Sequence, residues 1–281
     1  MNDNRAEATA PAVRAVILDW AGTAIDYGCV GPAAVFLEAF ARFGVTASVA
    51  QARRYMGLEK KDHIRAMLGL PELASQWRER QGREVGEGDV DLVYAATEPL
   101  MIEAIASHCG LIDGLLEFVA AMRERGIRIG SSTGYTAKMM EVVVPRAAAQ
   151  GYRPDAVVCS SDVPAGRPHP YMCYENALRL QVYPLSAMVK IGDTVSDIEE
   201  GRNAGMWTIG LTRCGNELGL TRRESEALAP SELRARIAGI EELYRRHGVH
   251  YVAAGIWDCL PILDDIERRL QAGTRPEDSW R

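Results

Sequence analysis

The first apolar run of the chain ends directly in a carboxylate, and this feature constrains the fold more than any other. Residues 16–18 (Val-Ile-Leu) have the β-branched, apolar character of a strand buried on both faces. Asp19 follows at once, and Gly22 and Thr23 break the pattern into a turn. Ligands of open parallel sheets bind outside the carboxyl ends of the strands. Asp19 is therefore a candidate for metal and phosphoryl chemistry, and the alternative is a carboxylate that only caps a helix.

Further apolar runs, alternating with helical patterns, predict a parallel sheet covered by helices on both faces. We expect strands at residues 127–129, 156–158, 188–191 and 207–211, and in the tail two helices around a short strand at 251–253. The predicted fold class is therefore α/β, with a Rossmann-like parallel sheet.

A long helical stretch separates the first strand from the second. About 75 residues of predicted helix lie between them, whereas a plain βαβ crossover is much shorter. The simplest account is an all-helical domain inserted after the first strand. We predict a discontinuous core of residues 1–28 and 107–281, and a helical cap of residues 29–106. The expected helices of the cap lie at 33–43, after Thr46 or Ser48 through Tyr55, at 58–68, and at 74–107 with a loop at 82–88.

Charge and composition argue against several classes of function. The formal net charge of −6 argues against broad binding to nucleic acid or acidic membranes. The sequence has no run of 18 apolar residues, so it predicts no membrane span. The polar, alanine-rich residues 1–11 predict a disordered tail rather than a signal peptide. The six cysteines are scattered and have no CxxC pairs. We therefore expect free thiols and a cytoplasmic protein.

Polar residues of different kinds follow the predicted strands. Thr133 follows the second strand, Arg167 the third, and Asp193 with Asp197 the fourth. Carboxylates suit Mg²⁺, while a hydroxyl and a fixed cation suit phosphoryl oxygens. Each motif alone can be a turn or a helix cap. Four of them in order, beginning with Asp19, predict a site for Mg²⁺ and a phosphoryl group.

This order of motifs resembles the haloacid dehalogenase superfamily. By that resemblance Asp19 is the nucleophile and Thr133 the phosphate-binding hydroxyl. Arg167 takes the place of the superfamily's usual lysine, and Asp193 with Asp197 forms its acidic motif. The helical insert resembles the small cap domain of that superfamily.

The chain departs from the superfamily two residues after the nucleophile. That position is usually an aspartate that serves as general acid and base for an alkoxide leaving group, and here it is Ala21. A methyl group cannot carry a proton. Ordinary hydrolysis of a phosphate ester is therefore disfavoured.

The longer motifs resemble the phosphonoacetaldehyde hydrolase (phosphonatase) family. They lie at residues 19–23, 26–29, 56–63, 130–135, 162–168 and 191–197, and the resemblance spans residues 14–220. It implies hydrolysis of phosphonoacetaldehyde to acetaldehyde and phosphate, in the degradation of 2-aminoethylphosphonate. It also implies a homodimer formed through the cap, and Mg²⁺ held by Asp19, Asp193 and the backbone carbonyl of Ala21.

The chemistry of C–P cleavage requires an amine. Such cleavage expels carbon, and an unassisted carbanion is a poor leaving group. A neutral lysine that condenses with the aldehyde gives a protonated imine, which accepts the electrons. The family pattern places this lysine at Lys60. Independently, Ile64, Met67 and Leu68 define the apolar stripe of the helix, and Lys60 lies nearer its centre than the alternative, Lys61.

Several neighbours complete the predicted site. His63 lies one turn after Lys60, within reach as a proton shuttle, and the alternative is a histidine on the helix surface. For Met56 and Tyr135, the alternative to a place in the substrate site is a packing role in the core. The expected substrate-binding residues are Thr133, Gly134, Arg167, Met56, Cys29 and Tyr135.

Two other functions stay open. A phosphatase or phosphomutase acting on a small phosphate ester predicts a general acid at position 21, where this chain has Ala21. A binding protein that has lost catalysis predicts a missing nucleophile or acidic pair, whereas Asp19, Asp193 and Asp197 are present. We therefore predict a C–P bond hydrolase.

Overall fold

One parallel sheet organises the molecule, which is known from a computed structural model that describes residues 12–280. Its six strands are ordered β3-β2-β1-β4-β5-β6, and every neighbouring pair is parallel. The strands are β1 (Ala15–Leu18), β2 (Arg128–Thr133), β3 (Ala156–Cys159), β4 (Met188–Gly192), β5 (Trp207–Leu211) and β6 (Tyr251–Ala253). The predicted α/β class is confirmed, whereas the tail predicted at residues 1–11 lies outside the described residues.

Helices cover both faces of the sheet. Val16 and Leu18 of β1 belong to the same apolar cluster as buried residues of three helices on one face, and Ile17 belongs to a second cluster on the other. This alternation follows from the two-residue period of a strand. The helices of the first face are α6 (Leu115–Glu124), α7 (Ala137–Ala149) and α12 (Cys259–Gln271), and those of the second are α8 (Tyr171–Leu180) and α9 (Val195–Asn203).

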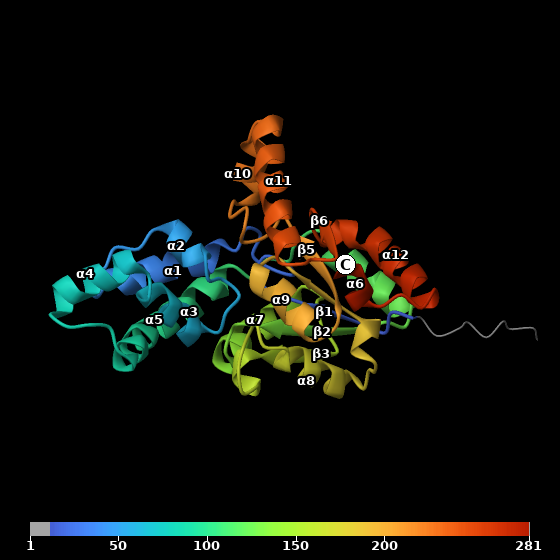
Figure 1. Ribbon diagram of the computed structural model, residues 1–281, viewed down its shortest axis with the longest axis horizontal. Coiled ribbons are helices and arrows are strands. Elements are labelled where there is room, and N and C mark those ends of the chain that lie inside the picture. The colour runs from blue at the N-terminus through green and yellow to red at the C-terminus, as the bar shows by residue number, and fades with distance from the viewer. Residues whose placement is uncertain (1–11, 281) are drawn as a thin grey trace, which may run out of the picture.

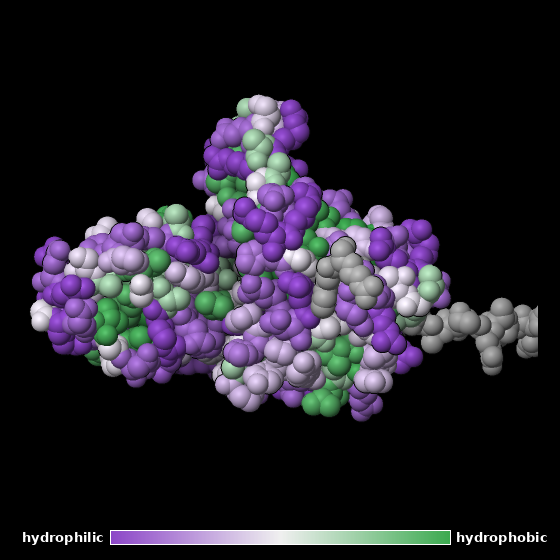
Figure 2. All heavy atoms as spheres, in the orientation of Figure 1, coloured by the Kyte–Doolittle hydropathy of each residue, from purple (hydrophilic) through white to green (hydrophobic). Residues whose placement is uncertain are grey.

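A helical lobe stands beside the sheet, at the left of Figure 1. We call helices α1–α5 the helical lobe: α1 (Val30–Ala41), α2 (Val49–Arg53), α3 (Lys60–Leu68), α4 (Pro71–Gln81) and α5 (Glu87–Ser107). Helix α5 packs against both α1 and α3. Figure 2 shows the lobe as a separate mass with a mixed, largely hydrophilic surface. The lobe spans nearly the same residues as the predicted insert, and the proposed boundaries at 29 and 106 stay a prediction.

Several elements differ by a few residues from their expected bounds, and the contacts explain two of these differences. Helix α1 begins at Val30 rather than Ala33, because the Asp26 carboxylate accepts from the backbone N–H groups of Val30 and Gly31. Such side-chain acceptors satisfy the free N–H groups of a first turn. Strand β2 does not stop at residue 129 but continues to Thr133, because its polar residues pair with β1 and β3.

The C-terminal part adds three helices and the edge strand β6. Helices α10 (Arg222–Ala227) and α11 (Pro230–Arg246) project above the sheet in Figure 1. Tyr244 and Ile240 of α11 pack against Ile198 and Leu218. Among residues 12–280, no helix is both long and apolar enough to cross a bilayer. Short 3₁₀ turns lie at Ser160–Asp162, Leu185–Ala187, Ile256–Asp258 and Pro276–Trp280.

Candidate active site

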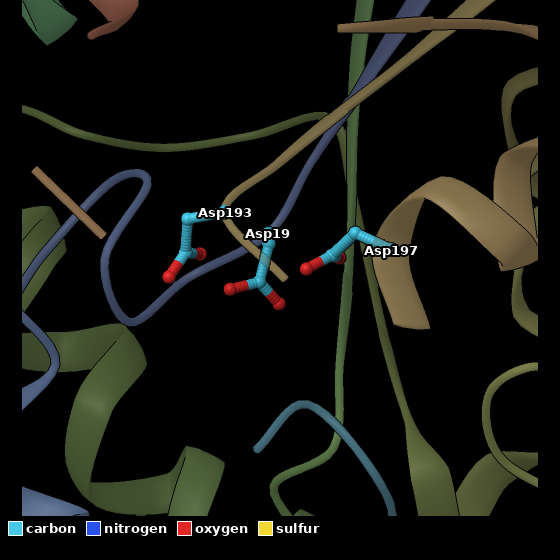
Figure 3. A group of neighbouring side chains, drawn as sticks. All are labelled: Asp19, Asp193 and Asp197. Carbon is cyan, nitrogen blue, oxygen red and sulfur yellow. The ribbon is translucent and has the colours of Figure 1, made fainter. Parts of the chain in front are cut away.

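Three carboxylates meet at the carboxyl edge of the sheet. Asp19 follows β1, Asp193 follows β4, and Asp197 lies in the first turn of α9. All three are buried, and one oxygen of each lies within 4.8 Å of an oxygen of the others. Figure 3 shows the Asp19 side chain between the other two. The strand topology therefore brings together the carboxylates that the sequence placed after separate strands.

Asp19 and Asp193 are neighbouring buried carboxylates that repel each other. Burial raises the pKa of Asp193 well above its usual range, and the charge of Asp19 raises it further. Burial likewise raises the pKa of Asp19. Thr23 Oγ1 and the Asn216 backbone N–H donate to the two oxygens of Asp193, at 2.9 and 2.8 Å. Two hard oxygen donors that repel each other out of water fit a divalent cation such as Mg²⁺.

Asp197 is already neutralised by cations of the protein. Burial alone would raise its pKa, but Arg167 and Lys190 hold that pKa below its usual value. Lys190 Nζ lies 2.6 Å and Arg167 Nη1 2.9 Å from Oδ1 of Asp197. Thr194 Oγ1 donates to the other oxygen at 2.6 Å. These contacts fit the predicted supporting role of Asp197 better than a role as metal ligand.

Arg167 is fixed by a different carboxylate at each of its nitrogens. Nη2 donates to Asp19 Oδ1 at 2.7 Å, Nε donates to Glu200 Oε2 at 2.8 Å, and Nη1 contacts Asp197. The arginine side chain is 1% exposed. Lys190 Nζ also lies 3.5 Å from Glu200. Sequence reasoning missed Glu200 and Lys190, which help to set the orientation of the predicted cationic side chain, Arg167.

A small cavity opens beside these charges. It is lined from both the sheet edge and the helical lobe. Of the residues predicted for the site, it brings together Asp19, Ala21, Cys29, Met56, Lys60, Thr133, Gly134, Tyr135 and Arg167. The cavity thus joins an amine from the lobe to a carboxylate, a hydroxyl and an arginine from the sheet.

Lys60 and Lys61 face opposite environments. Lys60 is 2% exposed, and its Nζ lies 5.0 Å from the centre of the Tyr135 ring. Burial lowers the pKa of Lys60. Lys61 instead reaches outward to Asp91, with 2.6 Å between Nζ and Oδ1. Because Glu59 caps the first turn of α3, the backbone is fixed where the two side chains diverge.

His63 is buried, so the alternative of a surface histidine is wrong. Its ring stacks on Phe36 with 3.9 Å between ring centres, and Nε2 lies 2.8 Å from the carbonyl oxygen of Ala52. Among the described residues, Nδ1 has no hydrogen-bond partner. Burial, and then the charge of Lys60, lower the pKa of His63 well below 6.5. The ring does not line the cavity, and its role as a proton shuttle stays a prediction.

Glycines allow the lobe to approach the sheet edge closely. A Cβ atom at Gly134 would overlap the carbonyl oxygens of Leu58 and Gly57. Gly57 itself has φ +90°, in the left-handed region that favours glycine. The connection between α2 and α3 therefore lies directly on the end of β2, which places Lys60 over the cavity.

The C-terminal part reaches the site through Tyr244. The hydroxyl of this buried residue of α11 donates to the carbonyl oxygen of Asp193 at 2.6 Å and to that of Leu211 at 3.1 Å. Sequence reasoning assigned this part of the chain no role. The structure shows that it supports the backbone of a candidate metal ligand.

Known proteins resemble this chain over nearly its whole length. A family model described as haloacid dehalogenase-like hydrolase matches residues 13–205. A curated relative from Syntrophobacter fumaroxidans named phosphonoacetaldehyde hydrolase is 54% identical, covering 94% of this chain and 95% of the relative. One of the same name from Bacillus cereus (strain G9842) is 45% identical, covering 92% and 97%.

Solved structures also resemble this chain over most of its length. The crystal structure of a phosphonoacetaldehyde hydrolase-like protein from Oleispira antarctica superposes with a TM-score of 0.93 at 38% identity, covering 95% of this chain and 97% of that one. A β-phosphoglucomutase from Clostridium difficile has a TM-score of 0.65 at 12% identity, covering 92% of this chain and 99% of that one. The second likeness concerns the fold alone.

Removing one candidate ligand tests the cation site. We expect saturating Mg²⁺ to stabilise the wild-type protein by about 2.7 kcal/mol at one hundred times its dissociation constant. Asp193→Asn should lose this stabilisation, because it removes one of the two neighbouring carboxylates that would hold the cation. Thermal unfolding with and without Mg²⁺ measures it, with the exposed Asp264→Asn as the matched control. Equal Mg²⁺ shifts in both variants would contradict the assignment.

The two lysines should titrate on opposite sides of the ordinary lysine value. Burial lowers the pKa of Lys60 from 10.5, whereas the hydrogen bond to Asp91 raises that of Lys61. As the pH rises, Lys60 therefore becomes a neutral amine first. Competitive labelling with acetic anhydride, read by mass spectrometry across pH, measures both in one sample. A Lys60 that titrates at or above 10.5 would be inconsistent with this environment.

Proposed function

The chain belongs to the phosphonoacetaldehyde hydrolase family of the haloacid dehalogenase-like hydrolases, and on this premise we propose that it hydrolyses phosphonoacetaldehyde to acetaldehyde and phosphate. The observation that carries the proposal is the shared cavity of Lys60 and Asp19. One supplies a buried amine with a lowered pKa, and the other a carboxylate oriented by Arg167. C–P cleavage needs both groups at one substrate.

Lys60 acts first in the proposed reaction. Its neutral amine adds to the aldehyde carbon, and the adduct takes up a proton and loses water to leave a protonated imine. Burial favours the neutral amine because it penalises the charged form. The Tyr135 ring, 5.0 Å from Nζ, lies where it can stabilise the cation once the imine forms.

Asp19 then takes the phosphoryl group. Arg167 holds Oδ1, so the second oxygen attacks phosphorus in line. The electrons of the C–P bond pass into the imine and give an enamine, together with an aspartyl phosphate. The enamine carbon takes a proton, and water hydrolyses the imine to acetaldehyde and free Lys60. A second water cleaves the aspartyl phosphate, so that the whole reaction consumes one water.

The remaining groups of the site bind and orient. Arg167 and the Thr133 hydroxyl would hold the phosphoryl oxygens. Asp19, Asp193 and the carbonyl of Ala21 would hold Mg²⁺, which when bound neutralises charge on the phosphoryl group. Ala21 carries no acid, and none is needed because the leaving group is an enamine rather than an alkoxide. This last feature disfavours the phosphatase or phosphomutase alternative.

The proposed cap and its closure follow from the separate placement of the amine, Lys60, and the nucleophile, Asp19. We assign residues 29–106 as a cap that carries Lys60 to Asp19 and excludes water. The order of steps also defines the substrate, since 2-aminoethylphosphonate has no carbonyl for an imine. We therefore place the reaction in the degradation of that amine after its conversion to the aldehyde. The six buried, free thiols agree with a cytoplasmic setting.

Borohydride trapping tests the imine directly. With phosphonoacetaldehyde present, wild-type protein should form a stable adduct on Lys60, while Lys60→Ala should neither trap nor release phosphate. Lys61→Ala is the matched control and should retain at least about half of the activity, because surface changes have small effects. Asp19→Ala should trap but release no phosphate. An adduct on a lysine other than Lys60 would falsify the assignment.

We also propose a homodimer formed through the cap. Val49 and Leu92 of the helical lobe are 50% and 54% exposed, which supports an apolar contact there. Light scattering should give about twice the chain mass of 30.8 kDa. The double variant Val49→Asp and Leu92→Asp should shift it to a monomer, whereas Leu178→Asp on α8 should not. A monomeric wild type would end this proposal.

A further inference from the structure

An arginine of the helical lobe reaches across to the loop that follows β5. Arg53, the last residue of α2, places Nη1 3.0 Å from the carbonyl oxygen of Gly28 and Nη2 3.1 Å from that of Gly219. Nη1 also lies 3.1 Å from Oδ1 of Asn216 and 3.2 Å from its carbonyl oxygen. Asn216 Nδ2 donates in return to the Arg53 carbonyl oxygen at 3.1 Å. We call this reciprocal pair the Arg53–Asn216 clasp.

The same loop lies on a candidate metal ligand. The backbone N–H of Asn216 donates to Asp193 Oδ2 at 2.8 Å. A Cβ atom at the preceding Gly215 would overlap the Asp193 side chain, so only glycine lets the loop approach this far. At the other end of the loop, a Cβ atom at Gly219 would lie 2.7 Å from Cζ of Arg53. The loop is thus fitted between the lobe's arginine and the carboxylate.

This arrangement links the segment that leads to Lys60 with the loop that fixes Asp193. Arg53 precedes the connection to α3, whose first residue is Lys60. Withdrawal of the lobe must break the bonds of Arg53 to Asn216 and so loosen the loop that fixes Asp193. A cation that orders Asp193 must, conversely, favour the loop position that Arg53 recognises. Neither Arg53 nor Asn216 lines the cavity, so neither acts on substrate directly.

We propose that the Arg53–Asn216 clasp couples closure of the helical lobe to binding of a divalent cation at Asp19 and Asp193. The two residues are positioning residues, and the inference rests on the proposed function only for the identity of that cation site. Such coupling is reciprocal: the factor by which closure strengthens cation binding equals the factor by which the cation favours closure.

Alkylation of Cys29 reports closure without any substrate. Cys29 lines the cavity at 2% exposure, and burial raises its pKa, so iodoacetamide reaches a reactive thiolate mainly when the lobe opens. Cys259, the first residue of α12, is fully buried in the core and reports global unfolding. Peptide mass spectrometry follows both residues in one sample, with and without Mg²⁺.

Arg53→Ala should label Cys29 about tenfold faster than wild type, within the usual range of coupling factors, while Cys259 stays protected. Mg²⁺ should slow Cys29 labelling in wild type and lose most of this effect in Arg53→Ala. The neighbouring, exposed Arg54→Ala is the matched control and should behave as wild type. Arg53→Lys keeps the charge but cannot bridge Asn216 and Gly219 together, so it should fall between the two.

Three results would overturn the proposal. The first is an unchanged Cys29 rate in Arg53→Ala, and the second is Mg²⁺ protection of equal size in both proteins. The third is parallel acceleration of Cys29 and Cys259, which would mean that Arg53 acts on global stability. Failure of the proposed reaction is separately visible, because it would appear in imine trapping on Lys60 and leave the labelling unaffected.

Discussion

The contact of Arg167 with three carboxylates is the interaction on which the site depends. A charge out of water is tolerated only when it is paired and hydrogen-bonded. The guanidinium satisfies Asp19, Asp197 and Glu200 from its three nitrogens, so the end of β1 and one face of α9 must meet it in a single geometry. Lys190 of β4 adds a second positive charge, in contact with Asp197. What remains is an excess of negative charge at Asp193 beside Asp19, where a divalent cation fits.

The sheet and the carboxylates could be predicted because both follow from local pattern and strand topology. Parallel strands bring their carboxyl ends to one edge, so a residue directly after a strand is placed by its position in the chain. Lys190 and Glu200 carried a weaker signal. A lysine inside the apolar run 188–191 needs a buried partner, and Glu200 lies one turn after Asp197 on the same helix face.

Other features depend on contacts that no local pattern contains. Strand β2 continues through buried polar residues because they have partners: the Ser132 hydroxyl donates to Glu200, 68 positions away in the sequence. Proximity in sequence placed His63 near Lys60, but packing on Phe36 and the bond to Ala52 decide where its ring points. Asn216 holds Asp193 through its backbone N–H, and Tyr244 donates its hydroxyl to the backbone carbonyl of Asp193, so neither contact could be seen in a local sequence pattern.

The contact of Tyr244 limits how far the chain can be shortened from its C-terminal end. Its hydroxyl satisfies the carbonyl of Asp193, yet it lies well beyond residue 205, where the match to the hydrolase family model ends. A fragment trimmed to that match would leave this buried acceptor without its donor. A catalytic unit therefore has to include α11, together with β6 and α12, which complete the sheet and its core.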